Sequence, residues 1–310
     1  MRKLLNTASQ LFDLSYPLQS GGKVGDALEQ LLSTVELDTE PEWCPKKTPS
    51  TEKQSLVTPQ QFFFYRPHFM EVMEDELAKA HKLQYALLPT QLPEYAPCRL
   101  SAVLESYCHL SGDIFGWHDL SGERLMLWLA DMSGHGAKAG VLSALLRILI
   151  DDQKDIEDPG AFVTTLNRRM YEALHADDDV LYATGAFMVI ESGMLRYVLA
   201  AHPPMLLRDG GGQPVRLGAG GRPVGVFRSS TYETAEVQLN DSAQLMMYTD
   251  GILEAGGESG EEFGIDRLAA AFAGSQGDAS EVTRQVYDAI SDHQDMRFIE
   301  DDVTLLAVEC

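Results

Sequence analysis

The stretch 109-HLSGDIFGWHDLSGERLMLWLADMSGHGAKAG-140 carries the strongest signal in this sequence. It places two carboxylates, Asp113 and Asp131, beside glycine-containing turns at the edges of apolar runs that are typical of β-strands. Serine–glycine and aspartate–glycine pairs are often only turns. Neither aspartate by itself therefore indicates a function.

Two further acidic sites lie far downstream, each beside another apolar run. Asp250 belongs to 247-MYTDGILEA-255, and Asp301 and Asp302 belong to 299-IEDDVTLLAVE-309. Carboxylates that gather in a partly buried site repel one another unless cations neutralise them. The four acidic sites together predict a centre for hard divalent cations.

The charge of the chain excludes one large class of partner. The 310 residues carry a formal net charge of −23, and 45% of them are hydrophobic, enough for a substantial core. Residues 1–66 contribute −1 and the remainder −22. Nucleic-acid binding normally needs a basic surface, so we expect no nucleic-acid partner. Most of the acidic excess is expected to be solvated surface.

The four cysteines, Cys44, Cys98, Cys108 and Cys310, form neither a C-x-x-C pair nor the start of a C-x₅-R loop. A cysteine-based zinc site and a cysteine-dependent phosphatase are therefore disfavoured. The sequence shows no signal peptide and no apolar run near twenty residues. These features predict a soluble, cytoplasmic protein with reduced cysteines and no membrane span.

The sequence predicts three regions along the chain. Residues 1–66 form a small regulatory or docking region of unknown type, with two short helical patterns and then a proline-interrupted segment. Residues 67–90 form a linker helix, because apolar residues recur at steps of three and four and prolines follow. Its apolar stripe could pack within the chain or pair with a second copy as a homodimer. Residues 91–310 form the main domain.

The main domain is predicted to be α+β, because strands and helices come in blocks and do not alternate regularly. We expect 235–239 and 244–248 to pair as neighbouring strands. Strands are predicted at 99–108, 124–130, 181–190, 194–200, 205–208, 235–239, 244–248 and 303–308, and helices at 137–150, 159–174, 265–273 and 279–292.

Six ordered motifs resemble those of the bacterial SpoIIE/RsbU-type serine/threonine phosphatases, which belong to the metal-dependent PPM phosphatases. The resemblance covers about residues 76–310. The motifs are 83-LQYALLPTQLP-93, 111-SGDIFG-116, 131-DMSGHGAKAG-140, 200-AAHPP-204, 248-YTDGILEA-255 and 301-DDVTLL-306.

The resemblance implies an α-β-β-α sandwich of two central antiparallel sheets with two divalent cations, Mn²⁺ or Mg²⁺, at one end. It implies that Asp131 bridges both cations and that the main-chain carbonyl of Met132 is a further ligand. Asp250 and Asp301 would hold one cation, and Asp113 would support the other. Asp302 remains open, because adjacent strand residues point to opposite faces and only one should face the site.

A paired-cation centre suits hydrolysis of a phosphate monoester. The cations neutralise phosphate oxygens and lower the pKa of a bridging water, so no serine, cysteine or histidine nucleophile is required. Oxygen-only ligands favour Mg²⁺ or Mn²⁺ over zinc. The neighbouring Gly134 and Gly136 indicate that His135 is a turn residue, although a general acid stays open. His202, which precedes two prolines at a strand end, is expected to be a structural hydrogen-bonding residue. Trp117 and His118 are expected to border the site without a chemical role.

Some positions depart from the family pattern. Gly116 replaces the second aspartate of the family's GGDxxD motif and Ser111 replaces its first glycine. Leu199 and Ala201 replace the preferred asparagine and glycine. None of these positions is a presumed direct ligand, so we expect an active enzyme.

The expected function is a metal-dependent protein serine/threonine phosphatase. By resemblance, its substrate would be a phosphorylated STAS-type anti-anti-sigma protein in a partner-switching pathway. An upstream sensor or docking partner would act through residues 1–66. The alternative is a regulatory binding module that keeps the PPM fold but has lost catalysis.

Overall fold

The computed structural model describes most of the chain from residue 59 onward. The chain divides into two units, residues 1–63 and 64–310, and residues 1–58, which include most of the predicted N-terminal region, lie outside the described part. None of the helices in the described part is long and apolar enough to cross a membrane. The described residues are 59–89, 98–120, 124–153, 156–174, 180–218, 221–256, 260–293 and 301–310.

Helix α3 spans Pro59–Tyr85 and therefore begins before the predicted start at residue 67. Pro59 is the first residue of the helix, a position where proline is favoured because its missing N–H would be unpaired anyway. The helix ends before Pro89, as expected, and a turn follows it. The linker helix of the sequence analysis is thus longer toward the N-terminus than the apolar spacing indicated.

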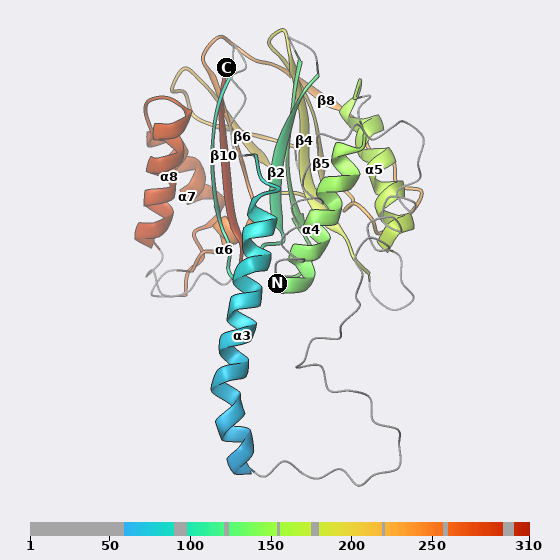
Figure 1. The fold of residues 1–310 in the computed structure, drawn as a ribbon. Helices are drawn as coiled ribbons and strands as arrows, with labels where there is room; N and C mark the ends of the chain where they lie inside the picture. The colour runs from blue at the N-terminus through green and yellow to red at the C-terminus, as the bar shows by residue number, and fades with distance from the viewer. Residues whose placement is uncertain are drawn as a thin grey trace. The chain divides into compact units, whose positions relative to one another are not determined.

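Two five-stranded antiparallel sheets form the centre of the domain (Figure 1). The first sheet has the order β1-β10-β9-β6-β7 and the second has the order β2-β3-β4-β5-β8. The first contains β1 Arg99–Glu105, β10 Val303–Glu309, β9 Ala243–Tyr248, β6 Met205–Asp209 and β7 Val215–Leu217. The second contains β2 Asp113–Asp119, β3 Arg124–Met132, β4 Ala183–Glu191, β5 Met194–Ala200 and β8 Ala235–Gln238.

The apolar run of β10 shows why both faces of the sheets are covered. Leu306 and Val308 pack in the core between the sheets, whereas Leu305 and Ala307 pack against the helices on the outer face. Successive side chains of a strand point to opposite faces. A nearly continuous apolar strand is therefore the pattern expected for a layer that is buried on both sides.

Helices cover the outer face of each sheet (Figure 1). Helices α4 Gly136–Asp151 and α5 Pro159–Leu174 lie on the second sheet, and α7 Gly264–Gly274 and α8 Ala279–His293 lie on the first. The short α6, Asp250–Glu254, lies beside β10. This arrangement confirms the predicted α-β-β-α sandwich.

The predicted pairing of 235–239 with 244–248 is wrong. Strand β8 pairs with β5 in the second sheet, whereas β9 pairs with β10 and β6 in the first. The connection between the two strands therefore crosses from one sheet to the other. Local alternation identifies a strand but does not identify its partner.

The expectation of reduced cysteines is wrong for two of the four. Strands β1 and β10 pair with Arg99 opposite Glu309, so the next residues outward, Cys98 and Cys310, come together and form a disulfide. Their Cα atoms are 4.2 Å apart although 212 positions separate them in sequence. Cys108 is free and exposed.

Candidate active site

Asp113 and Asp131 face each other across two neighbouring strands. Asp113 is the first residue of β2, Asp131 lies at the end of β3, and the antiparallel register places them directly opposite. Side chains at such positions have Cβ atoms about 4.5–5.5 Å apart. The structure thus brings together the two aspartates of the 109–140 stretch.

The carboxylate of Asp113 is buried and is bound from the opposite sheet. Its Oδ2 accepts hydrogen bonds from Oγ1 of Thr249 at 2.8 Å and from Oγ1 of Thr304 at 2.6 Å. Burial raises the pKa of Asp113 well above its usual range, and the charge of Asp131 raises it further, while the two threonine hydroxyls lower it. Sequence analysis missed both threonines, although Thr249 directly precedes Asp250 and Thr304 is two residues after Asp302.

Asp131 lies at the centre of the acidic cluster. Burial, together with the charges of Asp250 and Asp301 and then those of Asp302 and Glu254, raises the pKa of Asp131 to about 8. Carboxylates from the second sheet and from the α6–β10 side of the molecule therefore act on one another electrostatically. The structure thus brings Asp131, Asp250 and Asp301 within electrostatic range of one another.

Asp250 and Asp301 come together because α6 packs very closely on the start of β10. A Cβ atom on Gly251 would lie 2.1 Å from the main-chain oxygen of Asp302, so only glycine allows this approach. Burial raises the pKa of Asp250, and the charge of Asp301 raises it further. The glycine of the Asp250–Gly251 pair thus has a packing reason beyond a turn.

Glu254 is an acidic residue that sequence analysis did not select. It lies four positions after Asp250, on the same face of α6. Burial raises the pKa of Glu254, and the charges of Asp250 and Asp301 add to the shift. The helical spacing from Asp250 was the signal that could have identified it.

Asp302, whose role the sequence left open, binds the main chain of a neighbouring loop. Its Oδ1 accepts a hydrogen bond from the N–H of Tyr107 at 2.8 Å, and its Oδ2 accepts one from the N–H of Gly112 at 2.6 Å. Both oxygens are therefore used in holding the segment that leads into Asp113. The arrangement identifies Asp302 as a residue that positions its neighbours.

Met132 and Gly112 are in close contact next to the two opposed aspartates. The N–H of Met132 donates to the main-chain oxygen of Gly112 at 3.2 Å, and a Cβ on Gly112 would lie 3.0 Å from the main-chain oxygen of Met132. The backbone then turns through Gly134 and enters α4 at Gly136, and these two residues have φ values of 89° and 75°. Positive φ favours glycine at both positions.

The two histidines of the motifs occupy different environments. His135 is the exposed N-cap residue of α4, and its ring lies edge-on to Tyr107. His202 is buried, its Nδ1 lies 3.0 Å from Oγ1 of Thr184, and burial lowers its pKa to about 3. Since Thr184 is opposite Asp131 in the β3–β4 register, the neutral His202 supports the strand that borders the acidic cluster.

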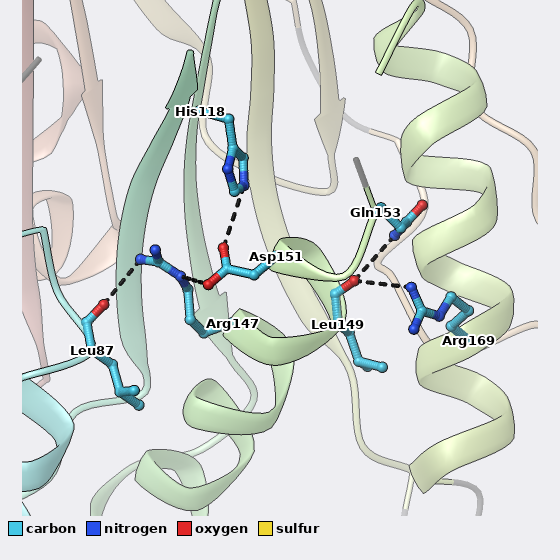
Figure 2. Close-up of polar contacts among 7 residues, drawn as sticks. All are labelled: Leu87, His118, Arg147, Leu149, Asp151, Gln153 and Arg169. Carbon is cyan, nitrogen blue, oxygen red and sulfur yellow. Dashed lines mark hydrogen bonds and ion pairs between the residues drawn. The ribbon is translucent and has the colours of Figure 1, made fainter. Parts of the chain in front are cut away.

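The expectation that His118 borders the site is wrong. His118 lies near the other end of β2, about 16 Å along the strand from Asp113 at the usual rise per residue. Figure 2 shows its ring toward α4, with Nε2 3.4 Å from Oδ1 of Asp151. Arg147 binds the other oxygen of Asp151 at 2.6 Å.

Gly116 lies on the same helix-covered face of β2 as His118, because the two residues are two positions apart on the strand. A Cβ on Gly116 would lie 2.5 Å from Cζ2 of the buried Trp128 and 3.0 Å from a guanidinium nitrogen of Arg147. Gly116, which stands where the family pattern has its second aspartate, therefore lies on the opposite face of β2 from Asp113. The space next to Gly116 is filled by the Trp128 ring.

The donor set suits a hard divalent cation, although the side chains do not form a closed cage. Within the described ranges, no three Asp, Glu, His or Cys side chains are grouped closely enough to hold one metal ion. The side-chain donors are carboxylate oxygens, which Mg²⁺ and Mn²⁺ prefer. Burial and, after it, the charges of Asp250 and Asp301 raise the pKa of Asp131, and a bound cation would favour its charged form.

The profile of the family described as "Stage II sporulation protein E (SpoIIE)" matches residues 121–310, more than half of the chain. The chain belongs to the SpoIIE family. The matched region contains Asp131, Asp250 and Asp301, while Asp113 lies just before it.

The SpoIIE-family chain also has similar relatives and a similar solved structure. It is 26% identical over 260 residues to Protein IcfG of Synechocystis and 25% identical over 185 residues to the phosphoserine phosphatase RsbP of Bacillus subtilis. These matches cover 75% and 58% of this chain but only 41% and 45% of IcfG and RsbP. The SiaA-PP2C domain of Pseudomonas aeruginosa has the same fold, with a TM-score of 0.67, 20% identity, and coverage of 78% of this chain and 98% of that domain.

Proposed function

We propose that this SpoIIE-family chain is a metal-dependent protein serine/threonine phosphatase. The observation that carries the proposal is the environment of Asp131, whose pKa is raised to about 8 by burial and by the charges of Asp250 and Asp301. Such a centre is destabilising unless a cation binds. The similarity to RsbP, a phosphoserine phosphatase, supports the same activity.

Within this proposal, Asp131, Asp250, Asp301 and the Met132 carbonyl hold two divalent cations, Mg²⁺ or Mn²⁺. Asp113 supports one of them, because its Oδ2 is already engaged by two threonine hydroxyls. When bound, the cations would neutralise the phosphoryl oxygens and make water nucleophilic near neutral pH. The protein itself orients the carboxylates. It holds Asp113 and Asp131 on one sheet and Asp250 and Asp301 beside the other.

The proposed substrate is a phosphorylated STAS-type anti-anti-sigma protein in a cytoplasmic partner-switching pathway. Family membership and the relationship to RsbP support this choice. Residues 1–66 are proposed to receive an upstream sensor or docking partner, and the linker helix to pair in a homodimer. Dephosphorylation would then change which protein the STAS partner binds.

The experiment that tests the activity compares wild type with Asp131→Asn and Asp250→Asn. Turnover of a phosphorylated STAS protein and of p-nitrophenyl phosphate is measured with Mn²⁺, with Mg²⁺ and with EDTA. We expect turnover only with a cation, and a loss of at least about a hundredfold in both variants, since even residues behind metal ligands contribute 10–100-fold. Asp241→Asn is the matched control, because it removes one charge from an exposed residue. Undiminished turnover in Asp131→Asn contradicts the proposal.

A second candidate function is a regulatory binding module without catalysis. The observation that favours it is the absence, in the described part of the chain, of three metal-binding side chains already grouped around one point. It predicts binding to the STAS partner with no turnover under any metal condition. The same assay, accompanied by a binding measurement, separates the two functions.

A further inference from the structure

Helix α5 and the loop between β7 and β8 carry arginines on the surface of a strongly acidic chain, whose formal net charge is −23. Arg168 of α5 and Arg222 of the loop are exposed and form no ion pair with another described residue. Arg228 of the loop pairs with Glu172 of α5 at 2.7 Å. Because Glu172 lies four positions after Arg168, on the same face of the helix, Arg228 is held next to the exposed face that carries Arg168.

An exposed aromatic ring lies beside two of these arginines. The exposed fraction of Phe227 is 56%, and the guanidinium carbon of Arg222 lies 6.0 Å from the centroid of its ring. Arg228 is the next residue in the chain. Aromatic and arginine side chains together are enriched where protein–protein interfaces gain most of their binding energy. We call Arg168, Arg222, Phe227 and Arg228 the α5 surface.

A buried asparagine of α5 holds the loop that presents Phe227. Nδ2 of Asn167 donates to the main-chain oxygen of Phe227 at 2.9 Å, and its Oδ1 accepts a hydrogen bond from the N–H of Gly225 at 2.8 Å. The hydroxyl of Tyr232 donates to the main-chain oxygen of Pro223 at 3.0 Å and closes the loop. A surface that is fixed before binding loses little conformational entropy when a partner docks.

The same loop joins the second sheet at the end where the acidic cluster lies. Val224 and Ala183 exchange two main-chain hydrogen bonds, of 2.8 and 2.9 Å, and Ala183 is opposite Met132 in the β3–β4 register. Val224 is therefore two strand spacings, about 10 Å, from Met132, the residue after Asp131. The α5 surface thus flanks the candidate active site.

The charge around the cluster differs between its two sides. Asp250 and Glu254 of α6 and Asp301 before β10 lie on the side of the first sheet, whereas α5 covers the outer face of the second sheet (Figure 1). A phosphoserine carries close to two negative charges at neutral pH. An acidic segment next to it would be repelled on the α6 side and attracted on the α5 side.

We propose that the α5 surface docks an acidic segment of the phosphoprotein substrate through its arginines. The choice of a phosphoprotein rests on the proposed phosphatase function, and the acidic segment on charge complementarity, which sets partner choice more than affinity. An extended chain advances about 3.3 Å per residue. The docked residues are therefore at least about three positions from the phosphoserine.

The test compares two synthetic peptides that each contain one phosphoserine, with glutamates in one peptide and lysines in the other from about the third position outward on both sides. In the double variant Arg168→Gln/Arg222→Gln, we expect the ratio of kcat/KM for the glutamate peptide to that for the lysine peptide to fall about 3–20-fold, since each exposed ion pair contributes modestly. High salt should reduce the difference. Turnover of p-nitrophenyl phosphate, which is too small to reach the α5 surface, should equal that of wild type.

The matched control is Arg99→Gln/Arg284→Gln. It removes the same charge from exposed positions of β1 and α8, which belong to the other side of the molecule. The ratio between the two peptides should stay at the wild-type value in this control. A fall equal to that of the Arg168→Gln/Arg222→Gln variant would assign the effect to net charge and overturn the proposal.

Fluorescence anisotropy of the labelled peptides separates docking from catalysis. If wild type shows no turnover but binds the glutamate peptide more tightly than the Arg168→Gln/Arg222→Gln variant does, docking is supported and the phosphatase proposal alone is contradicted. An unchanged peptide ratio in that variant overturns docking, even with normal turnover. So does an equal loss for both peptides and p-nitrophenyl phosphate. A change from dimer to monomer in sedimentation velocity also overturns docking, because it would assign the α5 surface to a second copy of the chain.

Discussion

The Oγ1 of Thr304 on β10 donates a 2.6 Å hydrogen bond to Oδ2 of Asp113 on β2, so a residue of one sheet orients a carboxylate of the other. Both side chains are buried. The bond, with that of Thr249, is one of the polar links across an otherwise apolar interface between the sheets. It joins the stability of the sandwich to the geometry of the acidic cluster.

Thr304→Val keeps the branched shape of the side chain and removes this donor. The buried carboxylate of Asp113 then has a single hydroxyl partner, and we expect the free energy of unfolding to fall by about 1–3 kcal/mol. Urea denaturation measures the change. Thr304→Ser retains the hydroxyl and should lie close to wild type. Equal stability of the valine and serine variants would contradict a role for the bond.

Asp302→Asn tests the assignment of Asp302 to positioning. An amide offers one acceptor oxygen in place of the two that bind the N–H groups of Tyr107 and Gly112. We expect folded protein with turnover reduced about 10–100-fold and with Mn²⁺ binding weakened but measurable. Asp301→Asn, which changes a proposed ligand, should abolish the binding of one cation. Identical calorimetric profiles for the two variants would contradict the distinction.

Gly116→Asp restores the residue that the family pattern prefers, yet we expect it to damage the protein. The new Cβ would lie 2.5 Å from Cζ2 of Trp128. Overpacking of this kind costs about 1–3 kcal/mol. Thermal unfolding measures the loss, and Gly116→Ala separates the steric part from the charge. An aspartate variant with raised turnover and wild-type stability would contradict this prediction.

The buried His202 predicts a specific loss of stability in acid. Its pKa is about 3 in the folded protein, so the unfolded chain takes up a proton below about pH 6.5 that the folded protein excludes. Stability present above pH 6.5 is therefore lost as the pH falls toward 3, by about 2 kcal/mol between pH 8 and pH 5.

His202→Gln removes this proton uptake. The difference between wild type and variant in the free energy of unfolding should shift by that amount between the two pH values. Equal pH profiles in denaturant titrations would contradict the neutral state of His202. The comparison uses the difference because carboxylates, Asp131 above all, contribute with the opposite sign in metal-free protein.

Cys98→Ser with Cys310→Ser tests the disulfide that joins the ends of β1 and β10. Without the cross-link the unfolded chain is less constrained. We therefore expect the free energy of unfolding to fall by about 2–4 kcal/mol. Unfolding of wild type with and without a thiol reductant should show the same difference. The Cys108→Ser control should show none, because that cysteine is free.

The sequence identified the elements well where their period was clear. The helix predicted at 159–174 and the strand predicted at 194–200 have the observed bounds. In both α5 and β5, buried positions recur along the element among more exposed ones, and such a pattern is visible in the sequence. The partner of a strand was harder to predict. The pattern of 235–239 gave no information that β8 pairs with β5, because that choice depends on packing between distant segments.

The candidate site shows the same limit. Motifs indicated which carboxylates gather, and the structure places Asp113 opposite Asp131. Gln84 and Asp302 lie within quoted motifs, but their hydrogen-bond partners have no local signature, because both side chains bind main-chain groups that any residue could supply. The hydrogen-bond partners of a side chain become visible only once the fold brings the loop to it.

The contact between Gly116 and Trp128 constrains the order in which this sequence can change. With the indole ring directly across the strand pair, an acidic residue at position 116 becomes tolerable only after a smaller residue has replaced Trp128. The reverse order passes through an overpacked intermediate. The two positions are therefore epistatic, and a residue that is neutral in one SpoIIE-family background can be inaccessible by a single substitution in this one.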